Sequence, residues 1–407
     1  MTTSVRLRDI GRAYGGLTAK TKADFGQGNA SFVTFVEVIG NARLRGHSLD
    51  RVRVAKAERQ NRVMRGDLLF NGSSETPEEV ALSAVVDFEP TASTYLNSFC
   101  FGFRVRSGAT ADPTYLAYFF RSSAGRSLVA CLAQGATRYN IAKTKFLDIE
   151  LDLPPMERQR EIVGSLCDAD DLTAALKRTI AKKRAVRQGI MQQLLTGKTR
   201  LPGFTERWRH VSVGELLEFK NGLNKGREFF GAGTPIVNFM DVMHGPLIRA
   251  ETVTGRVTLT QDEIKRFSAR RGDLFFTRTS ESVKEIGTVA VLVDEIRNAV
   301  FSGFILRGRP ISPDVDSLFL AYLFQTAEIR DAITSAATYT TRALTNGRTL
   351  SSIRAQIPPQ HEQRRIVEAL TDIENEIGIL RDRLTKAHHV KQGMMQELLA
   401  GQTRGDA

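Results

Sequence analysis

The chain has 407 residues, of which 42% are hydrophobic and 25% charged, as is normal for globular protein. This length can bury two ordinary domain cores. The net charge of +12 favours an anionic partner such as nucleic acid, although a basic protein without such a partner would have the same charge. No apolar run approaches the length of a membrane span, and three cysteines without motif spacing exclude a disulfide framework. We therefore expect a cytoplasmic protein.

Residues 1–153 are predicted to form a mixed α/β segment with many short strands. The run 31–38 is rich in β-branched and aromatic residues, which predicts a strand. Arg65-Gly66-Asp67 precedes another apolar run. In that position the triplet is interpreted as a structural turn and not as an adhesion motif. A helix is expected around residues 115–120.

Residues 154–200 are predicted to form a long helix that starts after a Pro-Pro pair and ends at Gly197. Its apolar residues keep a coiled-coil register. The predicted seam consists of Ile162, Leu166, Leu176, Ile180, Ile190 and Leu194. The seam is interrupted, because Thr173, Lys183 and Arg187 occupy three of its positions.

Residues 201–356 repeat the pattern of the first segment. The run 235–242 predicts a strand, and Arg271-Gly272-Asp273 predicts a turn before an apolar strand. A helix is expected around residues 319–324. We therefore expect a second mixed α/β segment on the same framework.

Residues 357–407 are predicted to form a second long helix, with apolar steps that alternate between four and three. Its seam consists of Ile366, Leu370, Ile373, Ile377, Leu380, Leu384, Met394 and Leu398. Lys391 occupies the one polar position. Each helix would be ~60 Å long. Antiparallel pairing of the two is favoured, and the alternative is two independent helices that each pack on their own segment.

The long helical segments are copies of each other. Residues 154–200 realign on residues 358–404 at a constant offset of 204 without a gap. Two repeats of ~200 residues are too few and too long for a solenoid. They suit a chain that imitates a twofold pair. The predicted fold class is α+β, with two mixed α/β domains, two long helices in an antiparallel coiled coil, and a pseudo-twofold relationship.

Polar residues after the Arg-Gly-Asp strands, and basic residues that recur in both copies or match loosely, are candidates for DNA contact. After the Arg-Gly-Asp strand, residues 71–75 read Asn-Gly-Ser-Ser-Glu and residues 277–281 read Thr-Arg-Thr-Ser-Glu. A similar apolar strand precedes these residues in both copies, whereas several of the polar side chains that follow it differ. This pattern is expected of loops that read base edges, although a solvated loop has the same composition. Cations beside hydroxyls and aromatics suit phosphate contact. The candidates are Lys20, Lys22, Asn71, Ser73, Ser74, Arg138, Tyr139, Lys143, Lys225, Arg227, Arg278, Thr279, Ser280, Thr341 and Arg342.

No motif for catalysis is found. Gly197-Lys198-Thr199 resembles the tail of a phosphate-binding loop, but Gln192 stands where that loop needs glycine, and the segment follows a helix. The six histidines have no metal-ligand spacing. We therefore predict no catalytic residue, no metal and no cofactor, although nuclease sites can be cryptic.

A Pro-Pro pair, then Gln159-Arg160-x-Ile162-Val163 or its second copy, then a long helix that ends in Leu-Leu-x-Gly-x-Thr-Arg, resembles the specificity subunit of type I restriction–modification systems. The resemblance covers the whole chain. It implies target-recognition domains at 1–153 and 201–356, and spacer helices at 154–200 and 357–407. Implied partners are double-stranded DNA, two methyltransferase subunits that bind S-adenosylmethionine, and ATP-dependent restriction subunits, with no membrane.

The same resemblance implies that the chain supplies sequence choice and no catalysis. Because Gly72 stands where the second copy has Arg278, the two domains are not expected to read identical half-sites. Two alternatives stay open at this point. One is an enzyme of a related restriction system with a hidden nuclease centre, and the other is a coiled-coil adaptor that ignores DNA.

Overall fold

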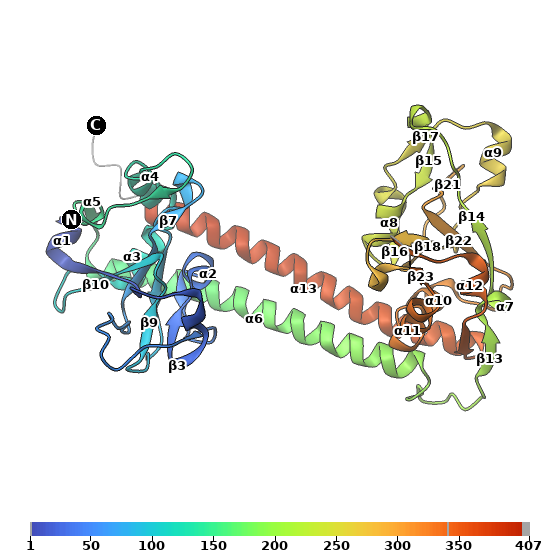
Figure 1. Ribbon diagram of the computed structural model, residues 1–407, viewed down its shortest axis with the longest axis horizontal. Coiled ribbons are helices and arrows are strands. Elements are labelled where there is room, and N and C mark those ends of the chain that lie inside the picture. Colours follow the sequence, from blue (N-terminus) through green and yellow to red (C-terminus); the bar gives the residue numbers. More distant parts are fainter. Residues whose placement is uncertain (1, 340–341, 401–407) are drawn as a thin grey trace. The chain divides into compact units, whose positions relative to one another are not determined.

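The computed structural model describes residues 2–339 and 342–400. The chain divides into two compact units. The first unit comprises the residues up to Lys177 together with those from Asp382 onwards, and the second comprises Arg178–Arg381. Each unit thus contains the first half of one long helix and the second half of the other. Figure 1 shows the elements of each unit along the colour gradient.

The strands of the first unit are β1 (Thr3–Arg6), β2 (Gly11–Gly15), β3 (Phe25–Val33), β4 (Arg43–Leu44), β5 (Asp50–Val52), β6 (Leu68–Asn71), β7 (Ser73–Ser74), β8 (Ser83–Val86), β9 (Thr94–Leu96), β10 (Cys100–Val105), β11 (Tyr139–Asn140) and β12 (Glu150–Leu153). Its helices are α1 (Leu7–Ile10), η1 (Lys22–Asp24), α2 (Phe35–Gly40), η2 (Pro77–Glu79), α3 (Pro113–Phe119), α4 (Ser123–Ala130), α5 (Lys143–Leu147) and the start of α6 (Met156–Leu195).

The strands of the second unit are β13 (Arg209–Ser212), β14 (Leu217–Asn221), β15 (Phe230–Val237), β16 (Leu247–Ile248), β17 (Arg256–Val257), β18 (Leu274–Thr277), β19 (Thr279–Ser280), β20 (Val289–Leu292), β21 (Val300–Phe301), β22 (Ile305–Pro310), β23 (Thr338–Tyr339), β24 (Ala343–Leu344) and β25 (Arg354–Ile357). Its helices are α7 (Val213–Leu216), η3 (Arg227–Phe229), α8 (Phe239–Met243), η4 (Ala250–Thr252), α9 (Gln261–Arg266), η5 (Val283–Glu285), α10 (Ser317–Leu323), α11 (Ala327–Ser335), α12 (Gly347–Ser351) and the start of α13 (Gln360–Ala400).

Both units are built on the same five-stranded sheet. Its order is β2-β10-β6-β8-β4 in the first unit and β14-β22-β18-β20-β16 in the second. The central strands β6 and β18 are fully buried along their length, as expected of strands covered on both faces. In the first unit, Phe70 stacks on Phe101 with ring centroids 5.2 Å apart and meets Phe146 edge-on at 4.7 Å. The prediction of two mixed α/β segments on one framework is confirmed.

The Arg-Gly-Asp triplets are structural turns, as predicted. Gly66 and Gly272 have φ of 82° and 88°, which favour glycine. Asp67 and Asp273 are buried, and each accepts two hydrogen bonds of 2.7 Å from one arginine, Arg104 or Arg309. A carboxylate enclosed in this way holds the turn to the next strand and is not available to an outside partner.

The predicted strands at 31–38 and 235–242 are wrong in their second halves. The first strand ends at Val33 and is followed by α2, and the second ends at Val237 and is followed by α8. Thr34 ends the strand because its hydroxyl accepts a hydrogen bond of 3.2 Å from the amide of Glu37, which caps a helix. Asn238 starts α8 with a capping box closed by Asp241. The helices expected around 115–120 and 319–324 are confirmed as α3 and α10.

The long helices run antiparallel within each unit. In the second unit, Lys183 of α6 forms an ion pair with Glu376 of α13, and Arg187 of α6 forms one with Glu374. The residue number of the partner in α13 decreases as the residue number in α6 increases, as it must in an antiparallel pair. In the first unit, Lys391 of α13 pairs with Asp170 of α6. The alternative of two independent helices is therefore not favoured.

The predicted seam residues lie on the covered side of the two helices. Ile162 and Leu166 join the core of the first unit, and Ile366 and Leu370 join that of the second. The predicted seam residues that are buried are Ile162, Leu166, Ile180, Leu194, Ile366, Leu370 and Ile377. The half-buried ones are Leu176, Ile190, Ile373, Leu380, Leu384, Met394 and Leu398. Helix α6 ends two residues before Gly197, and Gly401 lies outside the described residues.

A buried glutamine ties each long helix to its domain. The side-chain amide of Gln159 donates to the carbonyl of Thr110, and its carbonyl accepts from the amide of Asp112, the N-cap of α3. Gln363 accepts in the same way from the amide of Asp316, the N-cap of α10. The sequence motif after each Pro-Pro pair therefore fixes a helix start against a domain. No helix in the described part of the chain is long and apolar enough to cross a membrane.

Candidate nucleic-acid interface

Two sequence-distant candidate segments meet in the first unit. Strands β7 and β11 pair antiparallel, with Tyr139 opposite Ser74 and Asn140 opposite Ser73. This pairing places Arg138, which precedes β11, beside the segment predicted to read bases. Arg138 is exposed, and its guanidinium lies 5.7 Å from the centre of the Phe99 ring. Arg138 and Tyr139 therefore lie beside Ser73 and Ser74 in this unit.

The second unit repeats this arrangement. Strand β19 pairs with β24, with Thr279 opposite Leu344 and Ser280 opposite Ala343. Arg342, which precedes β24, is exposed and lies 3.5 Å from the carboxylate of Glu281. Both side chains of this pair are exposed, so Arg342 stays accessible to solvent. Thr341, another candidate, lies outside the described residues.

The expectation that residues 71–75 and 277–281 form loops, either base-reading or solvated, is wrong. Both contain short strands, and Asn71, Ser73 and Ser280 are buried. The amide of Asn71 donates to the carbonyl of Glu79 at 2.8 Å, and the hydroxyl of Ser280 donates to Glu285 at 2.9 Å. These side chains hold the backbone in place. Ser74, Arg278 and Thr279 are the half-buried members that retain access to solvent.

Two candidate lysines have internal partners. The side chain of Lys20 is only 4% exposed, and its amine lies 2.7 Å from a carboxylate oxygen of Glu58. This hydrogen bond, with one from the amide of Ala55, lowers the pKa of Glu58 to about 2. Lys225 pairs with Glu263 at 2.8 Å. Because both amines are already neutralised, we drop Lys20 and Lys225 as direct phosphate contacts.

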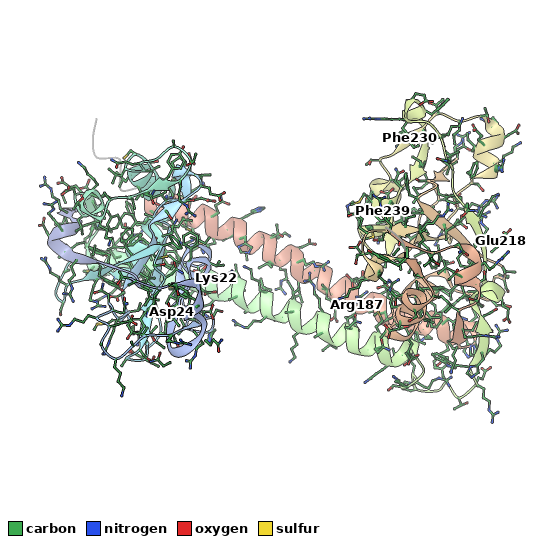
Figure 2. The ribbon with its side chains drawn as sticks, viewed as in Figure 1. Lys22, Asp24, Arg187, Glu218, Phe230 and Phe239 are labelled. Atoms are coloured by element: carbon green, nitrogen blue, oxygen red, sulfur yellow. The ribbon has the colours of Figure 1, made fainter. Side chains whose placement is uncertain are left out.

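The neighbouring cations are free of such pairing in the described residues. Lys22, labelled in Figure 2, begins η1 and is exposed. Arg227 begins η3 and is also exposed. Lys143 begins α5 and is exposed, beside Gly15 of β2. These three remain candidates for contact with an anionic ligand.

Two equivalent phenylalanines are functional candidates that the sequence reasoning missed. Phe99 precedes β10 and Phe304 precedes β22, and they are 58% and 64% exposed. The amide of Gly72 donates to the carbonyl of Phe99, and the amide of Arg278 donates to that of Phe304. Each aromatic thus borders a candidate segment, where an apolar ring can meet a thymine methyl group. The repeated phenylalanine before each matching strand was a usable signal.

Lys220 and Arg348 were also missed. With Arg278 they line a hollow of about 460 Å³ in the second unit. At the equivalent places, the first unit has Tyr14, Gly72 and Thr144. Comparison of the two copies could therefore not reveal these cations.

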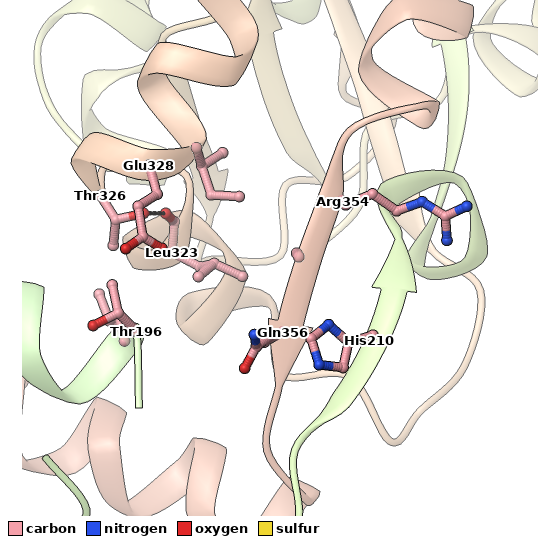
Figure 3. Close-up of a pocket in the computed structure, with 10 residues that line it drawn as sticks. Thr196, His210, Leu323, Thr326, Glu328, Arg354 and Gln356 are labelled. Atoms are coloured by element: carbon pink, nitrogen blue, oxygen red, sulfur yellow. Dashed lines mark hydrogen bonds between the residues drawn. The ribbon is translucent and has the colours of Figure 1, made fainter. Parts of the chain in front are cut away.

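A second hollow, of about 200 Å³, lies at the end of α6. Figure 3 shows Thr196 and Glu328 on one side of it and His210 with Gln356 on the other. Its charged lining combines Glu328 with Arg354. This mixture gives no preference for an anion, in contrast to the hollow beside Arg278.

The comparisons with known proteins agree with this architecture. Residues 2–183 and 205–388 each match the type I restriction modification DNA specificity domain. The chain belongs to this family. Each matched copy contains one mixed α/β part followed by most of a long helix. The repeat found in the sequence is therefore a repeat of the whole family domain.

Individual relatives are distant in sequence. The Escherichia coli type I restriction enzyme EcoKI specificity subunit is 24% identical over 72% of this chain, and the match spans 65% of that subunit's length. The S subunit of a type I restriction-modification system from M. genitalium has a TM-score of 0.55 and 12% identity, over 98% of this chain and 96% of that one. A chain from a structure on complex assembly and conformational transition of the type I R-M system has a TM-score of 0.61 and 18% identity, over 98% and 97%. The two structures share the fold of this chain.

Proposed function

We propose that this chain is the DNA sequence-specificity subunit of a type I restriction–modification complex. The observation that carries the proposal is the family match in two copies, which together cover nearly the whole chain. The domains are proposed at 1–153 and 201–356, and the spacer helices at 154–200 and 357–407. Each domain reads one half of a split target in double-stranded DNA. Membership of this family favours that role over a hidden nuclease or an adaptor that ignores DNA.

Each unit has a surface around two paired short strands, β7 with β11 or β19 with β24, and this surface supports the proposed role of the domains. In both units it combines exposed or half-buried cations with hydroxyls and an exposed phenylalanine. Side chains of these kinds contact phosphates and base edges. The proposed DNA contacts are Lys22, Ser74, Phe99, Arg138, Tyr139, Lys143, Arg227, Arg278, Thr279, Phe304 and Arg342.

The two long helices are proposed to set the separation of the half-sites and to bind two methyltransferase subunits. Exposed apolar side chains on the helices support the second role. Val186 is 46% exposed and its repeat equivalent, Val390, is 61% exposed. Leu172 and Ile379 are also more than half exposed. Large apolar residues on a helix surface are suited to a protein interface.

In this proposal the chain supplies recognition only. Methyl transfer from S-adenosylmethionine to adenine belongs to the methyltransferase subunits, and cleavage belongs to ATP-dependent restriction subunits. The test is reconstitution of the purified chain with its methyltransferase subunits. The complex is expected to bind and methylate one bipartite sequence, and the isolated chain is expected to have no turnover. Methylation or cleavage by the isolated chain would refute the proposal.

A further inference from the structure

We infer that the hollow beside Arg278 is a phosphate-binding site that anchors the second domain, but not the first, to the DNA backbone. The inference rests on the proposed function and deepens it. It assigns Lys220 and Arg348, neither of which the sequence pattern indicated. The hollow has three cationic lining residues that come from three separate parts of the second unit.

Each cation is placed by a different element. Lys220 is on the edge strand β14, Arg278 joins β18 to β19, and Arg348 is in α12. The backbone of Arg278 is fixed on both sides, because its amide donates to Phe304 and its carbonyl accepts from Thr345. Asn221 and Asn346 add polar groups to the same lining.

Glycine lets α12 approach β14 closely enough to form the hollow. A Cβ at Gly347 would lie 2.8 Å from the Cβ of Phe219, which is too close for two carbon atoms that are not bonded. The first unit has Lys143 and Ala13 at these two places. The close approach is therefore a feature of the second unit.

The three cations lack acidic partners. Within residues 2–339 and 342–400, none of Lys220, Arg278 and Arg348 forms an ion pair, whereas Lys225, Arg309 and Arg200 of the same unit each have one.

The number of cations favours a phosphate over a base edge. A guanine offers two acceptors in the major groove, which a single arginine can satisfy. A phosphate carries a full charge and accepts from several donors at once, including lysine, arginine and asparagine. Three cations with two asparagines therefore suit a phosphate better.

The first unit lacks this site. Tyr14 replaces Lys220 and donates its hydroxyl to Asp67 at 2.6 Å, and it lies opposite Gly102. Gly72 and Thr144 replace the two arginines. The corresponding surface keeps Lys143 as its cation. We therefore expect the two half-sites to be held with different salt dependence.

The test uses the full chain, assembled with its methyltransferase subunits, with Lys220→Gln, Arg348→Gln and both changes together. Affinity is measured across a salt titration for target DNA and for DNA with an altered second half-site. Arg354→Gln is the matched control, because Arg354 is an exposed cation in the mixed hollow of Figure 3. Thermal unfolding checks that each variant is folded.

Each substitution is expected to weaken binding to both DNAs by the same factor and to lower the salt slope by about 1. Arg354→Gln should leave both quantities unchanged. Unaltered salt slopes, with specific binding by the wild type, would overturn the phosphate site alone. Loss of discrimination at one base pair would also overturn it, since that result indicates base reading. A wild-type complex that binds no DNA at any salt would instead refute the proposed function.

Discussion

Arg187 of α6 and Glu374 of α13 form an ion pair across the two long helices, with 2.8 Å between Arg187 Nε and Glu374 Oε2. The guanidinium also lies 5.8 Å from the centre of the Tyr322 ring. The first unit repeats this cluster with Lys391, Asp170 and Tyr118. The charged residues that interrupt the seam, Lys183, Arg187 and Lys391, therefore have partners on the other helix, which favours one antiparallel register over its neighbours.

A double-mutant cycle tests this register pair. The side chains of Arg187 and Glu374 are 18% and 37% exposed, so the pair lies between a buried and a surface ion pair. Arg187→Glu is expected to lower the free energy of unfolding by about 1–3 kcal/mol. Adding Glu374→Arg should restore part of the loss, as measured by denaturant titration. Additive effects of the two changes would show that the residues do not interact.

Arg278→Gln tests base reading in the second domain. Arg278 is held by two backbone hydrogen bonds beside the exposed Phe304. As a member of the phosphate site, Arg278 is expected to be replaceable with equal loss of affinity for all DNAs and with discrimination unchanged. A contact with a base edge would instead relax discrimination at one base pair by about 1–3 kcal/mol. Affinities for DNAs with single changes in the second half-site measure this effect. Discrimination at every position equal to that of the wild type would exclude Arg278 as a reader.

Val186→Asp and Val390→Asp test the docking of methyltransferase subunits. A charge in the centre of an apolar interface is expected to cost more than about 1.4 kcal/mol, a tenfold loss of affinity. Analytical ultracentrifugation with the methyltransferase subunits measures the assembly. Because both side chains are exposed, the folded chain itself should keep its unfolding temperature. Full assembly of both variants would place the docking surface elsewhere.

Acid should release the segment held by Lys20 and Glu58. The Lys20 side chain, the amide of Ala55 and Gln60 lower the pKa of Glu58 from 4.5 to about 2. A lowered folded-state pKa gives stability that is complete above pH 4.5 and is lost as the pH falls toward 2. The stability difference between wild type and Glu58→Gln should thus be constant above about pH 5 and shrink below 4.5. Unfolding titrations from pH 7 to 3 measure it, and a difference that grows in acid would contradict the assignment.

The parts of the fold that depend on local pattern could be predicted from the sequence. The long helices follow from apolar spacing, and the Arg-Gly-Asp turns follow from their repetition before buried strands. The helix starts at Phe35 and Phe239 were missed because local caps outweighed the strand propensity of the residues that follow. The Thr34 hydroxyl accepts from the amide of Glu37, and the Asp241 carboxylate accepts from the backbone amide of Asn238. Propensity alone does not show where a cap will form.

The candidate site was predictable only in part. The sequence indicated residues 71–75 and 138–143 separately, and their meeting depends on the β7–β11 pairing between distant segments. Asn71 was misjudged because asparagine is common in loops. Its side-chain amide instead donates hydrogen bonds to the carbonyls of Ser73 and Glu79. Lys220 and Arg348 were missed because their significance depends on three elements that converge in one unit.

The central claim is that two different readers are held at a set separation by the paired helices. Single-molecule methylation mapping of DNA modified by the reconstituted complex tests it directly, for the wild type and for a variant without residues 175–181 and 379–385. The wild type is expected to methylate an adenine in each half of one bipartite motif. The variant, shortened by about 10 Å, should keep both half-sites and lose about three base pairs of spacer. A contiguous motif, or the same spacer in both proteins, would contradict the account.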